Sequence, residues 1–213
     1  MISTKDQEAL FELISNYLTR DITCIAIGGT AMMFSKYKNS TKGIDLVFKS
    51  SEDRDCFINA IESLGYKKMS ILGVYDKKRT SEKNVPLMFT RGDERFDLFV
   101  RDVFGYKLDF SQDVIMQRND FIGKFDLIVH ILQPVDLILL KSITGRQRDF
   151  EDIQTMLEFE KDVDFKDIVS KAIIQKENNP WILIDLEETL QKLKKSFFIK
   201  QEVFDMIYKA QGN

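Results

Sequence analysis

The chain has few of the residues that build disulfide scaffolds or zinc centres. Its 213 residues include two cysteines, one histidine and one tryptophan. Two cysteines are too few for a disulfide framework or a zinc site, and both stand in apolar surroundings, which predicts small buried side chains. This composition is typical of a reducing, intracellular setting, so we expect a cytoplasmic protein.

The sequence also lacks a strong charge of one sign and a long hydrophobic run. Its formal net charge of −3 gives no global attraction to nucleic acid or to an anionic membrane. The longest apolar segment, residues 127–140, is interrupted by Gln133, Pro134 and Asp136, which makes it too short and too polar to span a bilayer. The first ten residues lack the pattern of a signal peptide. We therefore expect no membrane partner.

What is present is the composition of a globular protein with a sizeable core. Hydrophobic residues make up 44% and charged residues 31% of the chain, and 17 phenylalanines predict dense aromatic packing. Short apolar runs that end in turn residues predict strands, and apolar residues at helical spacing predict helices. The predicted strands are 22–27, 44–48, 66–74, 85–90, 95–100 and 125–132. The predicted helices are 4–18, 30–37, 51–64, 108–117, 147–159, 163–178, 180–195 and 199–210, with another opening at Pro134.

These elements predict two regions. Strands and helices alternate up to residue 133, and from residue 134 onward only helices are expected. No linker separates the two parts, so we expect an α/β domain over residues 1–133 with a helical region, residues 134–213, packed on it. The fold class is then α+β, a small mixed β-sheet flanked by helices and followed by a C-terminal helical region.

A glycine pair follows the first buried strand. Gly28 and Gly29 stand between that strand and a helix for which Thr30 is a candidate N-cap. Free backbone N–H groups at such a turn favour phosphate, so we take these three residues as a candidate phosphate loop. A tight turn with no ligand is the alternative reading of the same residues.

Two strands each carry a single acid on the face opposite their apolar residues. These acids are Asp45 in "TKGIDLVF" and Asp97 in "ERFDLFV". A carboxylate in an apolar strand is unfavourable unless it is paired or binds a cation, and two of them on adjacent strands could share Mg²⁺ or Mn²⁺. Ordinary salt bridges are the alternative. The predicted metal and catalytic residues are Asp45 and Asp97.

A cationic helix follows the sheet region. Lys141 and Arg148 are seven residues apart and lie on roughly one helix face, where they could hold a polyphosphate, with Asp149 orienting Arg148. A structural ion pair of Arg148 with Asp149 is the other reading.

Taken in order, these pieces resemble the nucleotidyltransferase superfamily of polymerase-β-like enzymes, and within it the minimal and abortive-infection-toxin branch. The resemblance covers roughly residues 20–155, from the glycine pair through Thr41-Lys42-Gly43-Ile44-Asp45 and Asp97 to Lys141 and Arg148-Asp149. It implies transfer of a nucleoside monophosphate from a triphosphate (NTP) to a hydroxyl, with Mg²⁺-dependent release of pyrophosphate. Thr41 and Lys42 are implied as supporting residues.

One position departs from the family pattern. Gly43 stands where the family has its first acid, which is normally a ligand of both metals. Three hypotheses are therefore open: a transferase with a reduced metal site, a catalytically inactive relative that binds a nucleotide or a partner, and an unrelated α/β domain. The resemblance implies an RNA, protein or small-molecule acceptor for an active enzyme, and a partner protein for a toxin-antitoxin-like protein.

Overall fold

A computed structural model of the protein describes residues 1–70 and 85–212. Within these ranges the chain forms two compact units. Unit 1 comprises Met1–Phe104 and Leu108–Leu132, and unit 2 comprises Gly105–Lys107 and the chain from Gln133 onward. The packing of residues 134–213 on residues 1–133 stays a prediction.

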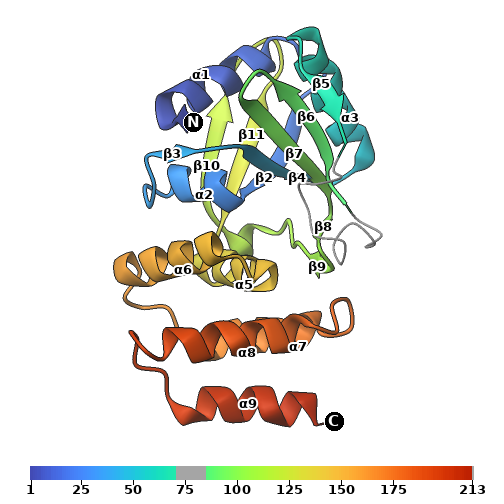
Figure 1. Ribbon diagram of the computed structural model, residues 1–213. Helices are drawn as coiled ribbons and strands as arrows, with labels where there is room; N and C mark the ends of the chain where they lie inside the picture. Colours follow the sequence, from blue (N-terminus) through green and yellow to red (C-terminus); the bar gives the residue numbers. More distant parts are fainter. Residues whose placement is uncertain (71–84, 213) are drawn as a thin grey trace. The chain divides into compact units, whose positions relative to one another are not determined.

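Unit 1 is built on a mixed seven-stranded sheet, which confirms the predicted α+β class (Figure 1). The strand order is β10-β11-β2-β4-β7-β6-β5, with parallel pairing only for β11 with β2 and for β4 with β7. The strands are β2 (Ile22–Ile27), β4 (Ile44–Phe48), β5 (Lys67–Met69), β6 (Leu87–Arg91), β7 (Glu94–Val100), β10 (Ile115–Phe121) and β11 (Leu127–Leu132). The remaining elements are β1 (Ile2–Ser3), α1 (Thr4–Ser15), α2 (Gly28–Phe34), β3 (Ser40–Thr41), α3 (Ser51–Ser63), β8 (Asp102–Val103) and the short 3₁₀ helix η1 (Gln112–Val114).

An aromatic core holds α3 against the centre of the sheet. The ring of Phe57 on α3 lies 5.3 Å from that of Phe48 on β4 and 5.4 Å from that of Phe96 on β7, measured between centroids. Side chains alternate between the two faces of a strand. Because Phe48 and Phe96 face α3, the odd-numbered residues Asp45 and Asp97 lie on the opposite face of the sheet.

Local signals placed several helix ends correctly. Ser3 and Asp6 form a capping box at the start of α1, and Gly65 adopts φ 88° two residues after α3. The N-cap prediction for Thr30 was wrong. Helix α2 begins at Gly28, so Thr30 lies inside that helix, and Ser50 caps α3.

The helix predicted over 108–117 is wrong. Residues 112–114 form a 3₁₀ turn, and from Ile115 the chain is the edge strand β10, paired antiparallel with β11. Of the strand predicted over 66–74, the structure has Lys67–Met69, and residues 71–74 lie outside the described residues.

Unit 2 is helical apart from the two-residue strand β9 (Tyr106–Lys107). Its helices are α5 (Pro134–Thr144), α6 (Gln147–Phe159), α7 (Phe165–Gln175), α8 (Ile182–Leu193) and α9 (Gln201–Gln211). Pro134 opens α5, and Gly145, with φ 62°, ends it and allows α6 to begin two residues later. None of the helices that the structure describes combines the length and apolar character needed to cross a bilayer.

Candidate functional site

The two strand-borne acids are brought together. Strands β4 and β7 pair in parallel with Asp45 directly opposite Asp97. Directly opposite residues on neighbouring strands have their Cβ atoms about 4.5–5.5 Å apart and share one face of the sheet. The structure therefore places both predicted acids side by side. Asp97 is buried, with 1% of its surface exposed, and Asp45 is half-buried.

The glycine pair lies against β3 and β4. A Cβ atom on Gly28, which has φ 57°, would come within 2.5 Å of the Asp45 carboxylate, and one on Gly29 would overlap the Thr41 hydroxyl. The hydroxyl of Thr30 is fully buried and accepts a hydrogen bond from the backbone N–H of Asp45 at 3.2 Å. Gly28 and Thr30 thus lie against Asp45, and Gly29 lies against Thr41. Binding of phosphate by these three loop residues stays a prediction.

A double-mutant cycle tests the close packing of Gly29 on Thr41. Gly29→Ala should destabilise the protein by about 1–3 kcal/mol, because the new methyl group has no space beside the hydroxyl. Thr41→Ala should recover part of this loss, so the coupling free energy from urea unfolding should be at least about 0.5 kcal/mol. Additive effects of the two substitutions would contradict the contact.

Arg95 shares the face of the two acids, and the sequence reasoning missed it. It lies two residues before Asp97 on β7, and its Nε is 3.1 Å from Asp97 Oδ1. A Cβ atom added to Gly43 would meet the Arg95 guanidinium at 3.3–3.4 Å. The guanidinium therefore lines the space beside Gly43 and is held against a buried carboxylate. Because side chains alternate between the two faces of a strand, the segment "ERFD" could have shown that Arg95 and Asp97 share a face. The position of Arg95 beside Gly43, however, depends on the pairing of two strands that are far apart in sequence.

Arg95 competes with a divalent metal ion for the carboxylate of Asp97. Among residues 1–70 and 85–212, no group of three or more histidine, cysteine, aspartate or glutamate side chains is placed to hold a metal ion. The Arg95 guanidinium lies where it already compensates the charge of Asp97, with its Nε 3.1 Å from Oδ1. Binding of Mg²⁺ or Mn²⁺ by Asp45 and Asp97 stays a prediction.

In unit 2, Lys141 lies in a buried ion cluster at the junction of α5 and α6. Its Nζ is 3.3 Å from Asp149 Oδ1 and 2.6 Å from Asp152 Oδ2, and all three side chains are at most 5% exposed. Arg146 Nε lies 2.6 Å from Asp149 Oδ2, and the Thr144 hydroxyl donates to the same oxygen. Two acids thus surround the lysine that the sequence assigns to a triphosphate.

The protonation of Asp149 reflects this cluster. Burial is the largest influence and on its own would raise the pKa of the carboxyl group. The charges of Lys141 and Arg146, with hydrogen bonds from Arg146 and Thr144, outweigh it, so the pKa of Asp149 lies below its ordinary value. Asp149 is therefore ionised at neutral pH and stabilises the junction as the counter-ion of Lys141.

Two of the other predicted residues, Arg148 and Lys42, are at the surface. Arg148 is exposed, and the arginine that pairs with Asp149 is Arg146, one turn before it. Lys42 is exposed, next to the buried Gly43. His130, the single histidine, is buried in β11, and its pKa is lowered by burial first and then by the charge of Arg118. Roles for Lys42, Lys141 and Arg148 in nucleotide binding stay predictions.

Comparison with known proteins supports the fold. No protein-family model and no curated protein matches the sequence. Among solved structures, the antibiotic-resistance factor ANT(2'')-Ia matches with a TM-score of 0.51 at 14% identity, over 88% of this chain and 98% of that chain. JHP933 from Helicobacter pylori matches with a TM-score of 0.45 at 13% identity, over 99% of this chain and 92% of its own. A further H. pylori structure matches with a TM-score of 0.45 at 12% identity, over 98% and 93% of the two chains.

ANT(2'')-Ia is a nucleotidyltransferase, so this likeness shows that the chain has a nucleotidyltransferase-like fold. In this structure the glycine pair lies at the end of β2, with one acid on β4 and one on β7.

Proposed function

We propose that this protein binds a nucleoside triphosphate through its phosphates at the face of β4 and β7 and does not transfer the nucleotide. The observation that carries this proposal is the Arg95 guanidinium beside Gly43, ion-paired with the buried Asp97. A guanidinium recognises phosphate oxygens through its planar set of donors. It also competes with a cation for the carboxylate of Asp97.

The proposal is consistent with the nucleotidyltransferase-like fold. In a transferase, cations must neutralise the phosphates and activate the attacking hydroxyl. Here the cation beside the two acids is a side chain of the protein, Arg95, which its ion pair with Asp97 holds in place. Such a group can hold the phosphates, but it cannot accept the proton of an attacking hydroxyl, because the guanidinium stays protonated at physiological pH. This chemistry supports binding without transfer.

Nucleotide binding is tested by thermal unfolding and calorimetry with ATP, GTP, CTP and UTP in turn. At a ligand concentration of about 100 Kd, binding should stabilise the protein by about 2.7 kcal/mol. For a chain of this size the unfolding midpoint should rise by about 5–10 °C. The matching nucleoside, which lacks phosphates, should give no shift. Equal shifts with nucleoside and triphosphate, or no shift with any triphosphate, would contradict the proposal.

A second candidate is transfer of a nucleoside monophosphate to the hydroxyl of an RNA, a protein or a small molecule. The pairing of Asp45 directly opposite Asp97 favours it, because two adjacent carboxylates are the minimum for a shared cation. Pyrophosphate release in the presence of Mg²⁺ or Mn²⁺ distinguishes the two functions. Release above the rate of an Asp45→Asn variant would establish the transferase and overturn binding without transfer.

A further inference from the structure

On the sheet face that carries Asp45 and Asp97, the side chain that covers the buried Asp97 is a cation. Asp97 is 1% exposed, whereas the Arg95 side chain that lies against it is 33% exposed. The carboxylate thus anchors the guanidinium from the protein side, while part of the arginine reaches solvent. An anion that approaches this face meets the arginine before it meets Asp97.

The guanidinium is also held in a defined place. Its Nε lies 3.1 Å from Asp97 Oδ1, and its Nε and Nη2 line the space over Gly43, at 3.3 and 3.4 Å from where a Cβ atom would be. Any larger residue at position 43 would press on the arginine. Because the planar guanidinium has five N–H donors, an arginine anchored on one edge can still bind phosphate oxygens with the others.

We propose that Arg95 is the resident cation of this site, so that the protein binds polyphosphate without a divalent metal ion. The inference rests on the proposed nucleotide binding and identifies the group that recognises the phosphates. Its chemistry follows from charge. Two carboxylates and a polyphosphate repel one another unless a cation lies between them. Strand pairing sets Asp45 opposite Asp97, and the Arg95 guanidinium lies against Asp97 and beside Gly43.

Calorimetry with inorganic tripolyphosphate in the presence of EDTA tests this directly, because this probe has no base and no sugar. The wild-type protein should bind it with chelator present, and Mg²⁺ should not strengthen binding. Arg95→Gln should weaken binding by about 10- to 100-fold, the usual worth of a charge-assisted hydrogen-bonded group. Arg95→Lys keeps the charge and should lose less than Arg95→Gln.

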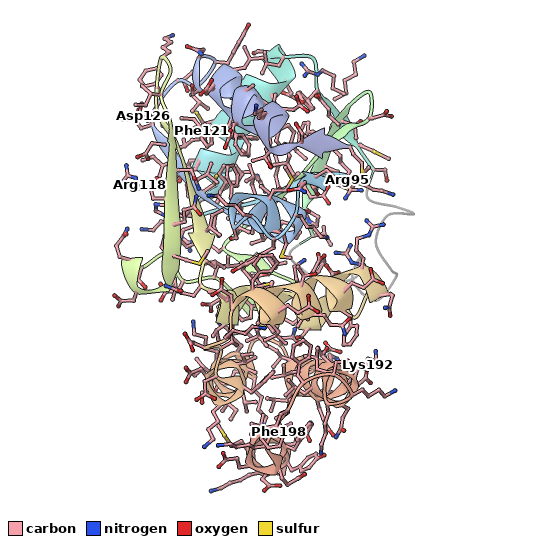
Figure 2. All side chains as sticks on the ribbon, turned by 90° about the vertical axis from the view of Figure 1, so that its left-hand side faces the viewer. Arg95, Arg118, Phe121, Asp126, Lys192 and Phe198 are labelled. Atoms are coloured by element: carbon pink, nitrogen blue, oxygen red, sulfur yellow. The ribbon has the colours of Figure 1, made fainter. Side chains whose placement is uncertain are left out.

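The chain supplies a matched control. Arg118 and Asp120 form the same Arg-x-Asp pair on β10, with Nε 2.8 Å from Oδ1, and three strands separate β10 from β7 in the sheet. Figure 2 shows Arg118 and Arg95 well apart. Arg118→Gln should leave tripolyphosphate binding unchanged. If Arg95→Gln unfolds the protein, the double variant Arg95→Gln with Asp97→Asn removes the arginine together with the buried carboxylate that it pairs with, and it should show the same weakened binding.

The outcomes separate this inference from the proposed function. If the wild-type protein binds tripolyphosphate and nucleoside triphosphate only when Mg²⁺ is present, nucleotide binding stands and the role of Arg95 is overturned. The role of Arg95 is also overturned if Arg95→Gln binds tripolyphosphate in EDTA as tightly as the wild-type protein does. Failure of both ligands with and without Mg²⁺ overturns both proposals.

Manganese alone gives an independent test by electron paramagnetic resonance. The wild-type protein should not bind Mn²⁺ saturably in the absence of phosphate, because the guanidinium occupies the place of the metal. The double variant Gly43→Asp with Arg95→Ser adds a third carboxylate and removes the arginine, so it should gain Mn²⁺ binding. Saturable binding of Mn²⁺ to the wild-type protein at Asp45 and Asp97 would overturn the inference.

Discussion

Lys141→Met should destabilise the protein by about 3–5 kcal/mol, the usual result of removing one partner from a buried ion pair. Methionine is close to lysine in length and apolar, so little packing is lost. What is lost is the cation between Asp149 and Asp152, both nearly inaccessible to solvent. Asp149 would keep its contact with Arg146, but Asp152 would lose a cation that lies 2.6 Å away, and both carboxylates would stay buried. Urea unfolding followed by circular dichroism and by the fluorescence of Trp181, the single tryptophan, measures the loss.

Two further variants show whether the buried charges are the cause. Lys166→Met removes an ion pair of the same type with Glu202, but both side chains are more than 40% exposed, so its effect should stay below about 1 kcal/mol. Adding Asp149→Asn and Asp152→Asn to Lys141→Met also removes the two buried carboxylates that faced the lysine, and this should restore most of the stability. A triple variant as unstable as Lys141→Met would contradict this account.

The single variant Lys141→Met also separates two interpretations of Lys141. A lysine that binds triphosphate should be replaceable with little loss of stability and a large loss of nucleotide affinity. A lysine that joins α5 to α6 should show the opposite. The short distance to Asp152 and the burial of the cluster favour the structural role.

Elements with strong local signals could be predicted from the sequence. The strand Ile22–Ile27 and the helix Gln147–Phe159 agree with prediction to the residue, because an apolar run ended by glycines and a regular helical period are both local patterns. Strand β10 was missed for the corresponding reason. Its exposed side carries polar residues such as Arg118 and Asp120, and pairing with β11 rather than composition makes it a strand.

The site was predictable in part for similar reasons. Alternation placed Asp45 and Asp97 on the polar faces of their strands, and the structure pairs them. Arg95 was missed because its role depends on which residue lies opposite on the neighbouring strand. The glycine pair shows the same limit of local patterns: its spacing suits a phosphate loop, but the side chains that press on it, Asp45 and Thr41, lie more than ten residues away along the chain.

Phe96→Ala should destabilise the protein by about 3–5 kcal/mol, as large-to-small substitutions of buried aromatic residues do. Phe96 is fully buried on β7, and its ring lies 5.4 Å from that of Phe57 and 5.0 Å from that of Tyr66. Edge-to-face pairs of this kind add about 0.5–1.5 kcal/mol beyond the burial of area. The residue also stands between Arg95 and Asp97 in the chain, so it anchors the strand that presents both.

Urea unfolding measures the loss of stability in Phe96→Ala, and hydrogen exchange should show faster opening of β4 and β7. Phe198→Ala is the control, because that ring is 86% exposed and its removal should change stability by no more than about 0.5 kcal/mol. Tripolyphosphate binding by the folded fraction of Phe96→Ala should also weaken, since a loosened β7 no longer holds the guanidinium over Gly43. A loss of stability no larger than that of the control would show that the aromatic cluster does not anchor β7.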